Sequence, residues 1–225
     1  MHTAIPAALF DPFSLAVVLG GTLLATFLRC GRTGMAAAFR SIARLLRPRF
    51  SYEKARAKVA AQVDDIRHDG LHRAHPLASD DREIDEATSA LIRHRSIAAL
   101  QETHLRHVDA RRRLATRAEE TLMQAGDLAP VFGLAGTLLA LSQLPVDGLA
   151  PQDMAATVAT AVLTTLYGLL SANLLFYPLA RLAARRAQEE EEEREHLFDW
   201  LSAQVSGVMA EERAARTGRN PDIAA

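Results

Sequence analysis

Three threonines inside uncharged stretches are the residues of this 225-residue chain whose types and spacing could do chemistry. Thr137 lies in "LAPVFGLAGTLLAL" (128–141), and Thr164 and Thr165 lie in "AVLTTLYGLLSANLLFYPLA" (161–180). Threonine hydroxyls are neutral hydrogen-bonding groups, and inside a closed set of helices they could hold water or an ion. The chemistry they could support is the passage of an ion.

Small residues share the helix faces that carry Thr137 and Thr165. Each set repeats at steps of three and four residues, which keeps it on one face of an α-helix. The two stripes are Pro130, Gly133, Thr137 and Ala140, and Ala161, Thr165, Gly168 and Ala172. Small residues allow membrane helices to approach closely. The stripes therefore fit packing alone, or packing combined with a pore-facing role, and the residues by themselves leave both interpretations open.

The chain contains no recognisable enzyme motif: it has no phosphate loop, GxSxG, HExxH or CxxC. Its only cysteine, Cys30, excludes an intrachain disulfide, and a net charge of −1 argues against a general nucleic-acid binder. Two histidine pairs have helical spacing, but they lie in arginine-rich sequence without carboxylates at ligand spacing: His68/His72 and His104/His107. We expect these histidines to face solvent, and we expect no metal site, catalytic residue or cofactor.

Three uncharged runs, 12–28, 128–146 and 154–180, are 17, 19 and 27 residues long. A membrane-spanning helix needs about 20 apolar residues. Buried helices of a soluble bundle usually show a polar stripe, and these runs show none. We therefore predict an all-α integral membrane protein with three transmembrane helices and long cytoplasmic helical extensions. The runs contain no Asp, Glu, Lys, Arg or His, so a titrating group for ion transport would have to come from another chain.

The arginines predict the orientation of the chain. Six arginines and no acid lie between 29 and 49, and Arg181, Arg185 and Arg186 follow the third run, whereas the N-terminal tail and residues 145–153 contain no Lys or Arg. Positive residues concentrate on the cytoplasmic side of membrane proteins. The expected division is a periplasmic tail (1–11), a cytoplasmic helical region (29–127), a periplasmic loop (147–153) and a cytoplasmic C-terminal helix and tail (181–225).

Within the polar regions we expect a helix over 51–69, a break over 71–79 and a second helix that starts at Asp80. Glu83 would complete a capping box, and this helix would run without a break into the second membrane segment. The third membrane segment would likewise continue into the polar C-terminal region. The run "EEEEERE" (189–195) forms i, i+4 pairs with arginines, which favours a solvated helix face, with a subunit contact as the alternative.

The membrane segments resemble the MotA/TolQ/ExbB proton-channel family. "LAPVFGLAGTLLAL" resembles its pore segment, which reads roughly Ala-Pro-x-x-Gly-x-x-Gly-Thr. Residues 161–180 are similar to the last membrane helix of the MotA branch, including Thr165, Gly168, Asn173 and Pro178, and residues 11–28 resemble that branch's second membrane helix. The resemblance covers all three runs in the right order.

The resemblance implies a pentameric ring in the bacterial inner membrane around a dimer of single-span, MotB/ExbD/TolR-like partners, whose membrane aspartate carries the proton. It implies an ion pathway at Thr137, Thr164 and Thr165. Pore-helix hinge and packing roles would fall to Pro130, Gly133, Gly136, Ala161, Gly168, Ala172 and Pro178. The expected function is an ion-conducting energy-coupling or stator subunit that contacts lipid and binds no nucleic acid. The alternative is a non-conducting scaffold or sensor that retains the ring fold.

Two departures from the MotA pattern bear on the function. The MotA branch usually has a further membrane helix before the segment that resembles 11–28, so three spans match the TolQ/ExbB topology. "DIRHDGLHRAHP" (65–76) resembles that branch's "ARREGLLALE" stretch through Arg67, Asp69, Gly70 and Leu71, but lacks its glutamate. Because flagellar rotor contacts of the family lie in this region, Arg67 and Asp69 are candidate cytoplasmic partner contacts, and the machine that is driven stays open.

Overall fold

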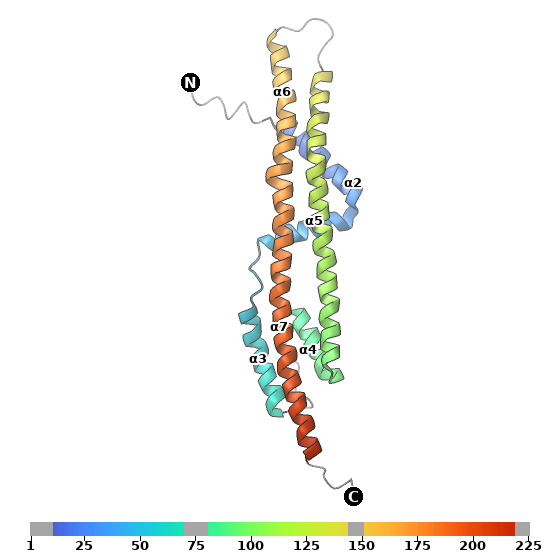
Figure 1. Cartoon of the computed structure of the whole chain (residues 1–225). Coiled ribbons are helices and arrows are strands. Elements are labelled where there is room, and N and C mark those ends of the chain that lie inside the picture. The colour runs from blue at the N-terminus through green and yellow to red at the C-terminus, as the bar shows by residue number, and fades with distance from the viewer. Residues whose placement is uncertain (1–10, 70–80, 144–150, 219–225) are drawn as a thin grey trace, which may run out of the picture. The chain divides into compact units, whose positions relative to one another are not determined.

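The computed structural model describes residues 11–69, 81–143 and 151–218, and every regular element within these ranges is helical (Figure 1). The elements in chain order are α2 (Pro12–Leu45), α3 (Tyr52–Asp69), α4 (Arg82–His94), α5 (Ile97–Ser142), α6 (Pro151–Leu170), the π-helix η1 (Ser171–Phe176) and α7 (Tyr177–Gly218). Three stretches are long and apolar enough to cross a membrane: Pro12–Leu45, Ile97–Ser142 and Met154–Ala210. The all-α prediction with three membrane-length helices is confirmed.

The chain divides into two compact units. Residues Met1–Arg47 and Leu114–Arg186 form one, here called the apolar unit, and Pro48–Arg113 and Ala187–Ala225 form the other, here called the charged unit. Helices α5 and α7 contribute to both units. The candidate ion-pathway threonines lie in the apolar unit.

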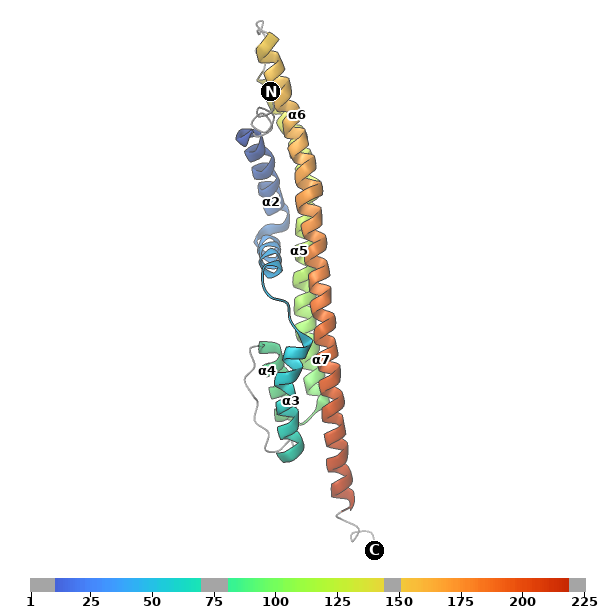
Figure 2. The same cartoon turned by 90° about the vertical axis from the view of Figure 1, so that its left-hand side faces the viewer.

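Helix α2 begins as its sequence dictates. The Asp11 carboxylate accepts hydrogen bonds from the backbone N–H groups of Phe13 (3.1 Å) and Ser14 (3.3 Å), and Pro12 occupies the first turn. Gly31 then interrupts the helix with φ 66° and ψ −174°, a conformation that glycine adopts without steric penalty. The bend within α2 is visible in Figure 2, where the lighter blue part turns away from the direction of the darker part.

The helix that contains the third membrane run continues into α7 without a stop, as expected, but the six residues of η1 have wider π turns. The backbone N–H of Tyr177 bonds the carbonyl of Ala172, five residues earlier. Pro178 follows directly and has no N–H to give to the ladder. Interruptions of this kind commonly place a π segment inside a long α-helix.

The prediction of one unbroken helix from Asp80 into the membrane segment is wrong. Helix α4 starts at Arg82, with the Asp81 carboxylate accepting from the N–H of Glu83 at 3.0 Å, and ends at His94. Arg95 adopts the left-handed conformation, with φ 50° and ψ 39°, and α5 starts at Ile97. The chain contains no Gly or Pro at this break.

The apolar core of the charged unit explains the break. Reversing the chain after α4 lets its apolar stripe meet residues of α3, α5 and α7 in one cluster, which an unbroken helix would keep apart. The buried members are Ala55, Val59, Val63, Ile84, Ala87, Leu91, Leu100, Leu197, Phe198, Leu201, Val205 and Val208. Burying a large aliphatic side chain contributes roughly 1.5–3 kcal/mol. Several such residues outweigh the roughly 1–2 kcal/mol that a left-handed arginine costs.

Candidate functional site

The structure brings the three candidate ion-pathway threonines together. The Oγ1 atom of Thr137, on α5, lies 2.6 Å from Oγ1 of Thr165 and 3.2 Å from Oγ1 of Thr164, both on α6. It also lies 2.9 Å from the carbonyl oxygen of Ala161 and 3.1 Å from that of Gly133. The two small-residue stripes that the sequence placed on separate helices therefore pack against each other.

Close packing of the two backbones makes this cluster possible. A Cβ atom on Gly168 would lie 2.7 Å from the Ala129 carbonyl oxygen and 3.0 Å from Cα of Gly133. Ala129 is fully buried and Ala161 is 3% exposed. At such a distance only glycine leaves room for the neighbouring helix, which explains why the stripe consists of small residues.

The geometry of the cluster limits where its hydroxyl protons can point. Thr164 donates to the carbonyl of Ala161 at 2.8 Å. Thr137 has one proton, and either oxygen can be the donor in its contact with Thr165. If Thr165 donates to Thr137, then Thr137 can donate to the carbonyl of Ala161 or of Gly133. If Thr137 donates to Thr165, the Thr165 proton is free for another acceptor. The hydrogen bond between the two hydroxyls can therefore run in either direction.

The remaining predicted packing residues surround the cluster. Gly136 lies against Thr164, whose Cγ2 atom would be 3.1 Å from an added Cβ. Pro130 lies inside α5, and its Cα would be 3.2 Å from a Cβ on Gly168. Ala172 is fully buried in a small cluster with Ala125, Ala129 and Phe176. Pro178 lies in the first turn of α7, two residues after the π segment.

Large apolar side chains remain exposed on the same two helices. They recur at helical spacing, so each helix presents an apolar stripe that its own chain does not cover. The exposed residues are Val131, Leu134, Leu138 and Leu141 on α5, and Val158, Val162, Leu166 and Leu169 on α6. Lipid or other protein chains must cover such stripes, because isolated soluble proteins rarely expose contiguous apolar area of this kind.

One polar pair on the same two continuous helices, about 15 Å along α5 from the threonine cluster, was missed from the sequence. The Tyr177 hydroxyl donates to Oδ1 of Asp127 at 2.8 Å. Asp127 directly precedes the second uncharged run, and this position was the only available signal. The phenol gives the carboxylate a hydrogen-bond donor at the end of the uncharged run.

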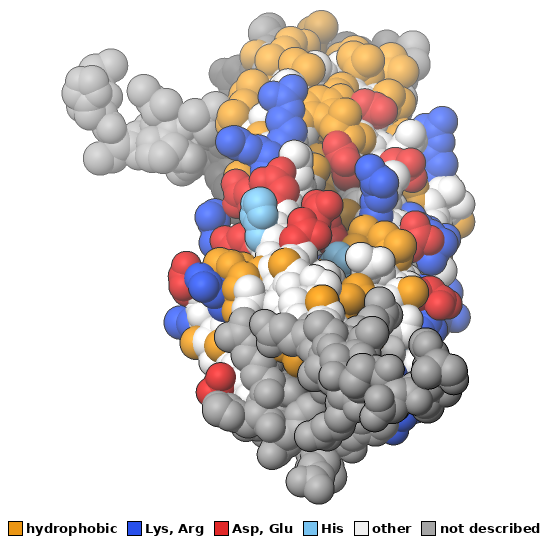
Figure 3. All heavy atoms as spheres, turned by 60° about the horizontal axis from the view of Figure 1, so that its bottom comes forward, with side chains coloured by type: hydrophobic (Ala, Val, Ile, Leu, Met, Phe, Trp, Pro, Cys, Tyr) orange, Lys and Arg blue, Asp and Glu red, His pale blue; other side chains and the backbone are white. Residues whose placement is uncertain are grey.

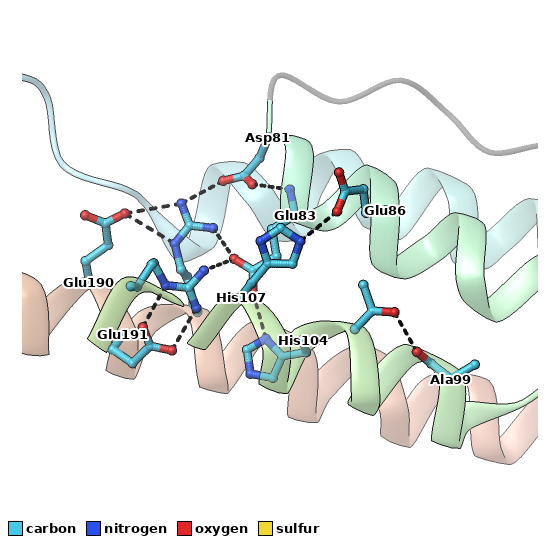
Figure 4. Close-up of polar contacts among 11 residues, drawn as sticks. Asp81, Glu83, Glu86, Ala99, His104, His107, Glu190 and Glu191 are labelled. Carbon is cyan, nitrogen blue, oxygen red and sulfur yellow. Dashed lines mark hydrogen bonds and ion pairs between the residues drawn. The ribbon is translucent and has the colours of Figure 1, made fainter. Parts of the chain in front are cut away.

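The charged unit contains a buried ion network centred on Glu83 (Figure 4). Glu83 is 3% exposed and binds His104 at 2.8 Å, Arg194 at 2.8 Å and also Arg111. Burial by itself would raise the pKa of Glu83, but the hydrogen bonds from His104 and Arg111 and the charges of Arg111 and Arg194 outweigh it and lower that pKa. Glu83, on α4, is thus held as a carboxylate by side chains from α5 and α7.

The expectation that His104 and His107 face solvent is wrong. His104 is 12% exposed at its side chain, contacts Glu83 and stacks on Phe198 with ring centroids 4.0 Å apart. His107 binds Glu86 at 2.8 Å. The carboxylates come from α4, 21 residues earlier, so only the reversal of the chain brings them within reach. Within the described residues, no group of three or more His, Cys, Asp and Glu side chains is placed to hold a metal ion.

The acidic run 189–195 is also more than a solvated helix face. Glu191 binds Arg111 through both carboxylate oxygens at 2.7 and 2.8 Å, and Glu193 accepts from the backbone N–H of Tyr52 at 3.2 Å. Of the expected i, i+4 pairs, Glu190–Arg194 is present at 3.2 Å, and Arg194 also binds Asp81 at 2.7 Å. Acidic and basic side chains are accordingly intermixed on the face in Figure 3. The run holds the charged unit together.

The candidate partner contacts Arg67 and Asp69 lie in the last turn of α3. Their side chains, and residues 70–80 with the rest of the resembling stretch, lie outside the described part of the chain.

Comparison with known proteins agrees with this architecture. The family model described as the MotA/TolQ/ExbB proton channel family matches residues 59–196. The uncharacterized protein YtxD of Bacillus subtilis is 33% identical over 160 residues, which cover 71% of this chain and 50% of that protein. The chemotaxis protein PomA of Vibrio alginolyticus is 27% identical over 165 residues, which cover 73% of this chain and 56% of that protein. The chain thus spans about half the length of these curated relatives.

A solved structure shares the fold. The flagellar MotAB stator complex from Bacillus subtilis matches with a TM-score of 0.77 at 18% sequence identity, over 89% of this chain and 80% of the matched chain. At 18% sequence identity, the match shows only that the two chains share the same arrangement of helices.

Proposed function

Because this chain belongs to the MotA/TolQ/ExbB proton channel family, we propose that it is an ion-conducting, stator-type subunit that converts an ion gradient into mechanical work. Protons are the proposed ion. The chain works with a single-span partner that carries a membrane aspartate, and together they drive a molecular machine with the energy of the ion gradient.

One observation carries the proposal: the membrane runs bring a hydroxyl cluster together but contain no Asp, Glu, Lys, Arg or His. A charged side chain at the centre of a bilayer costs roughly 3 kcal/mol or more, and ion pathways usually contain one. A chain that conducts without one needs a carboxylate from a partner helix. Thr137, Thr164 and Thr165 then serve as the neutral groups beside it.

The reversible hydrogen bond between Thr137 and Thr165 suits both protonation states of such a carboxylate. When the carboxylate is protonated, Thr165 donates to Thr137 and accepts the acid proton's hydrogen bond at its free lone pair. When the carboxylate is ionised, Thr137 donates to Thr165, and the Thr165 hydroxyl turns to the carboxylate. No charged group of this chain has to enter the bilayer for either arrangement.

The proposed assembly is a homo-pentamer in the bacterial inner membrane around a dimer of the partner. The exposed apolar stripes on α5 and α6 support it, because neighbouring copies and the partner would cover them. Native mass measurement in mild detergent is expected to give five times the mass of one chain; a stable monomer or dimer would contradict the ring.

The proposed orientation places the N-terminus in the periplasm and the C-terminus in the cytoplasm. A cysteine that replaces Asp147 should therefore be labelled from outside, and one that replaces Ser206 should not.

The functional test replaces Thr165 with Val, which keeps the shape and removes the hydroxyl. In vesicles that contain this chain and its partner, Thr165→Val should abolish gradient-driven proton flux while the complex still assembles. Leu170→Val, on an exposed position of the same helix, is the control and should retain flux. Full flux through Thr165→Val would refute the pathway. Absence of flux in the unaltered complex would favour the non-conducting scaffold or sensor.

A further inference from the structure

A polar pocket lies between α2 and α5 in the apolar unit, away from the threonine cluster. Its volume is about 580 Å³, and its lining is Arg29, Cys30, Thr33, Gly34, Arg117, Glu120, Thr121 and Gln124. We call it the α2–α5 pocket. The proposed ion pathway uses none of these residues, so the pocket needs an explanation of its own.

One of the residues that line the α2–α5 pocket, Gln124, carries an unsatisfied acceptor. Oε1 of Gln124 is the one buried side-chain oxygen or nitrogen without a hydrogen-bond partner among the described residues. A buried acceptor left without a donor costs roughly 1–3 kcal/mol. With the carboxamide oxygen of Gln124 in this position, the group that satisfies it is a hydrogen-bond donor.

The charged residues around the α2–α5 pocket favour a ligand that carries both a negative and a positive group. Arg29 and Arg117 supply two positive charges, and Glu120 supplies one negative charge. Within the described ranges, the charged groups of these three side chains form no ion pair or hydrogen bond with the protein. Guanidinium groups bind phosphate well, whereas a carboxylate beside an amide oxygen attracts a positively charged donor.

The position of the pocket along the helices matches the headgroup layer of a membrane. Arg29 directly follows the uncharged run of α2, and Gln124 lies four residues before the uncharged run of α5. From Gln124 to Arg117 the helix rises roughly 10 Å, comparable to the headgroup region on one side of a bilayer. Exposed apolar side chains on α2 precede Arg29, with Leu24 at 61% and Leu28 at 74% exposure, and offer a surface for an acyl chain.

We propose that the α2–α5 pocket binds the headgroup of an aminophospholipid. Its phosphate binds Arg29 and Arg117, and its primary ammonium donates to Gln124 Oε1 and to the Glu120 carboxylate. A choline headgroup has the same charges but no N–H donor, so it leaves Gln124 unsatisfied. A headgroup with a net negative charge gains the arginines but has no cation for Glu120.

The test measures which lipid the full-length chain retains. The chain is extracted from vesicles with equal parts of phosphatidylethanolamine, phosphatidylcholine and phosphatidylglycerol, and bound lipid is counted by native mass spectrometry. Phosphatidylethanolamine should exceed phosphatidylcholine by roughly tenfold, because a charge-assisted hydrogen bond is at stake. Equal retention of the two lipids, or preferred retention of phosphatidylglycerol, would overturn the proposal without reference to any variant.

Matched variants locate the effect. Gln124→Leu and Glu120→Gln should each remove most of the preference for phosphatidylethanolamine, and Arg29→Gln combined with Arg117→Gln should lower retention of all three lipids. Glu119→Gln and Arg32→Gln, adjacent charges outside the lining, should change neither. An equal loss in these controls would overturn the site. Displacement of the lipid by soluble phosphoethanolamine at comparable concentration would overturn a membrane lipid as the ligand. These outcomes are distinguishable from the ion-flux test, because lipid retention requires no partner and no gradient.

Discussion

Replacing Gly168 with alanine should separate the two helices that carry the threonine cluster. The added Cβ would lie 2.7 Å from the Ala129 carbonyl oxygen, whereas ordinary contact begins at 3.4 Å, so α5 and α6 must part by 3.4 − 2.7 = 0.7 Å. The neighbouring atoms belong to the backbone and cannot rotate away. Overpacking of this kind costs roughly 1–3 kcal/mol. A rigid shift of 0.7 Å would also lengthen the 2.6 Å contact between Thr137 and Thr165 to the outer limit of a hydrogen bond.

The assay is thermal unfolding of the purified full-length chain in detergent, followed by circular dichroism. Gly20→Ala is the matched control, since an added Cβ there meets nothing within 4 Å. Both variants gain up to about 1 kcal/mol of helix propensity, so the difference between them isolates the clash. Gly168→Ala should unfold at a temperature several degrees below Gly20→Ala, at about 2–4 °C per kcal/mol. Equal midpoints would refute the close approach of α5 and α6.

Two further predictions concern the charged unit. Glu83→Gln should lower the free energy of unfolding at pH 7 by about 2 kcal/mol, because Arg111 and Arg194, both largely shielded from solvent, each lose one charge-assisted hydrogen bond and keep their other carboxylates. Since the pKa of Glu83 is lowered from 4.5, its stabilisation is present above that pH and is lost as the pH falls through its folded-state pKa. Denaturation curves of the unaltered chain and of Glu83→Gln should therefore converge below pH 4.5, and a constant gap would contradict the linkage. Glu86→Gln, whose side chain is 42% exposed, should cost less stability than Glu83→Gln. Arg95→Gly should stabilise the chain by about 1 kcal/mol, because glycine adopts φ 50° freely. Arg93→Gly, inside α4, should destabilise it, and an equal loss in both variants would contradict the left-handed turn.

The membrane-length helices and the faces of the pore segment were predictable from local sequence. Partition into a membrane depends on the composition of each run, and the position of a residue on a helix face depends on spacing alone. Thr137 and Thr165 could thus be placed on single faces before any contact was known. The motif around Pro130 and Gly133 indicated the family, and the match to the family model confirms that the chain belongs to it.

The contacts between helices depended on the whole chain. Arg95 terminates α4 without any local breaker, because burial of Ile84 and Leu91 against α7 outweighs a strained backbone. The partner of His104, Glu83, lies 21 residues earlier in the chain, and helical periodicity cannot predict a contact at that separation.

What the sequence determined by itself is therefore the class of the protein, its three membrane-length helices and the residues that share each face. Tertiary structure alone decided that Thr137 meets Thr165 at 2.6 Å, that Glu83 is a buried charge and that Gln124 lacks a donor. The physical reason is that hydrophobicity and helix periodicity act within a few residues. Burial, by contrast, is the joint property of side chains from distant segments, and it assigns each polar group its partner.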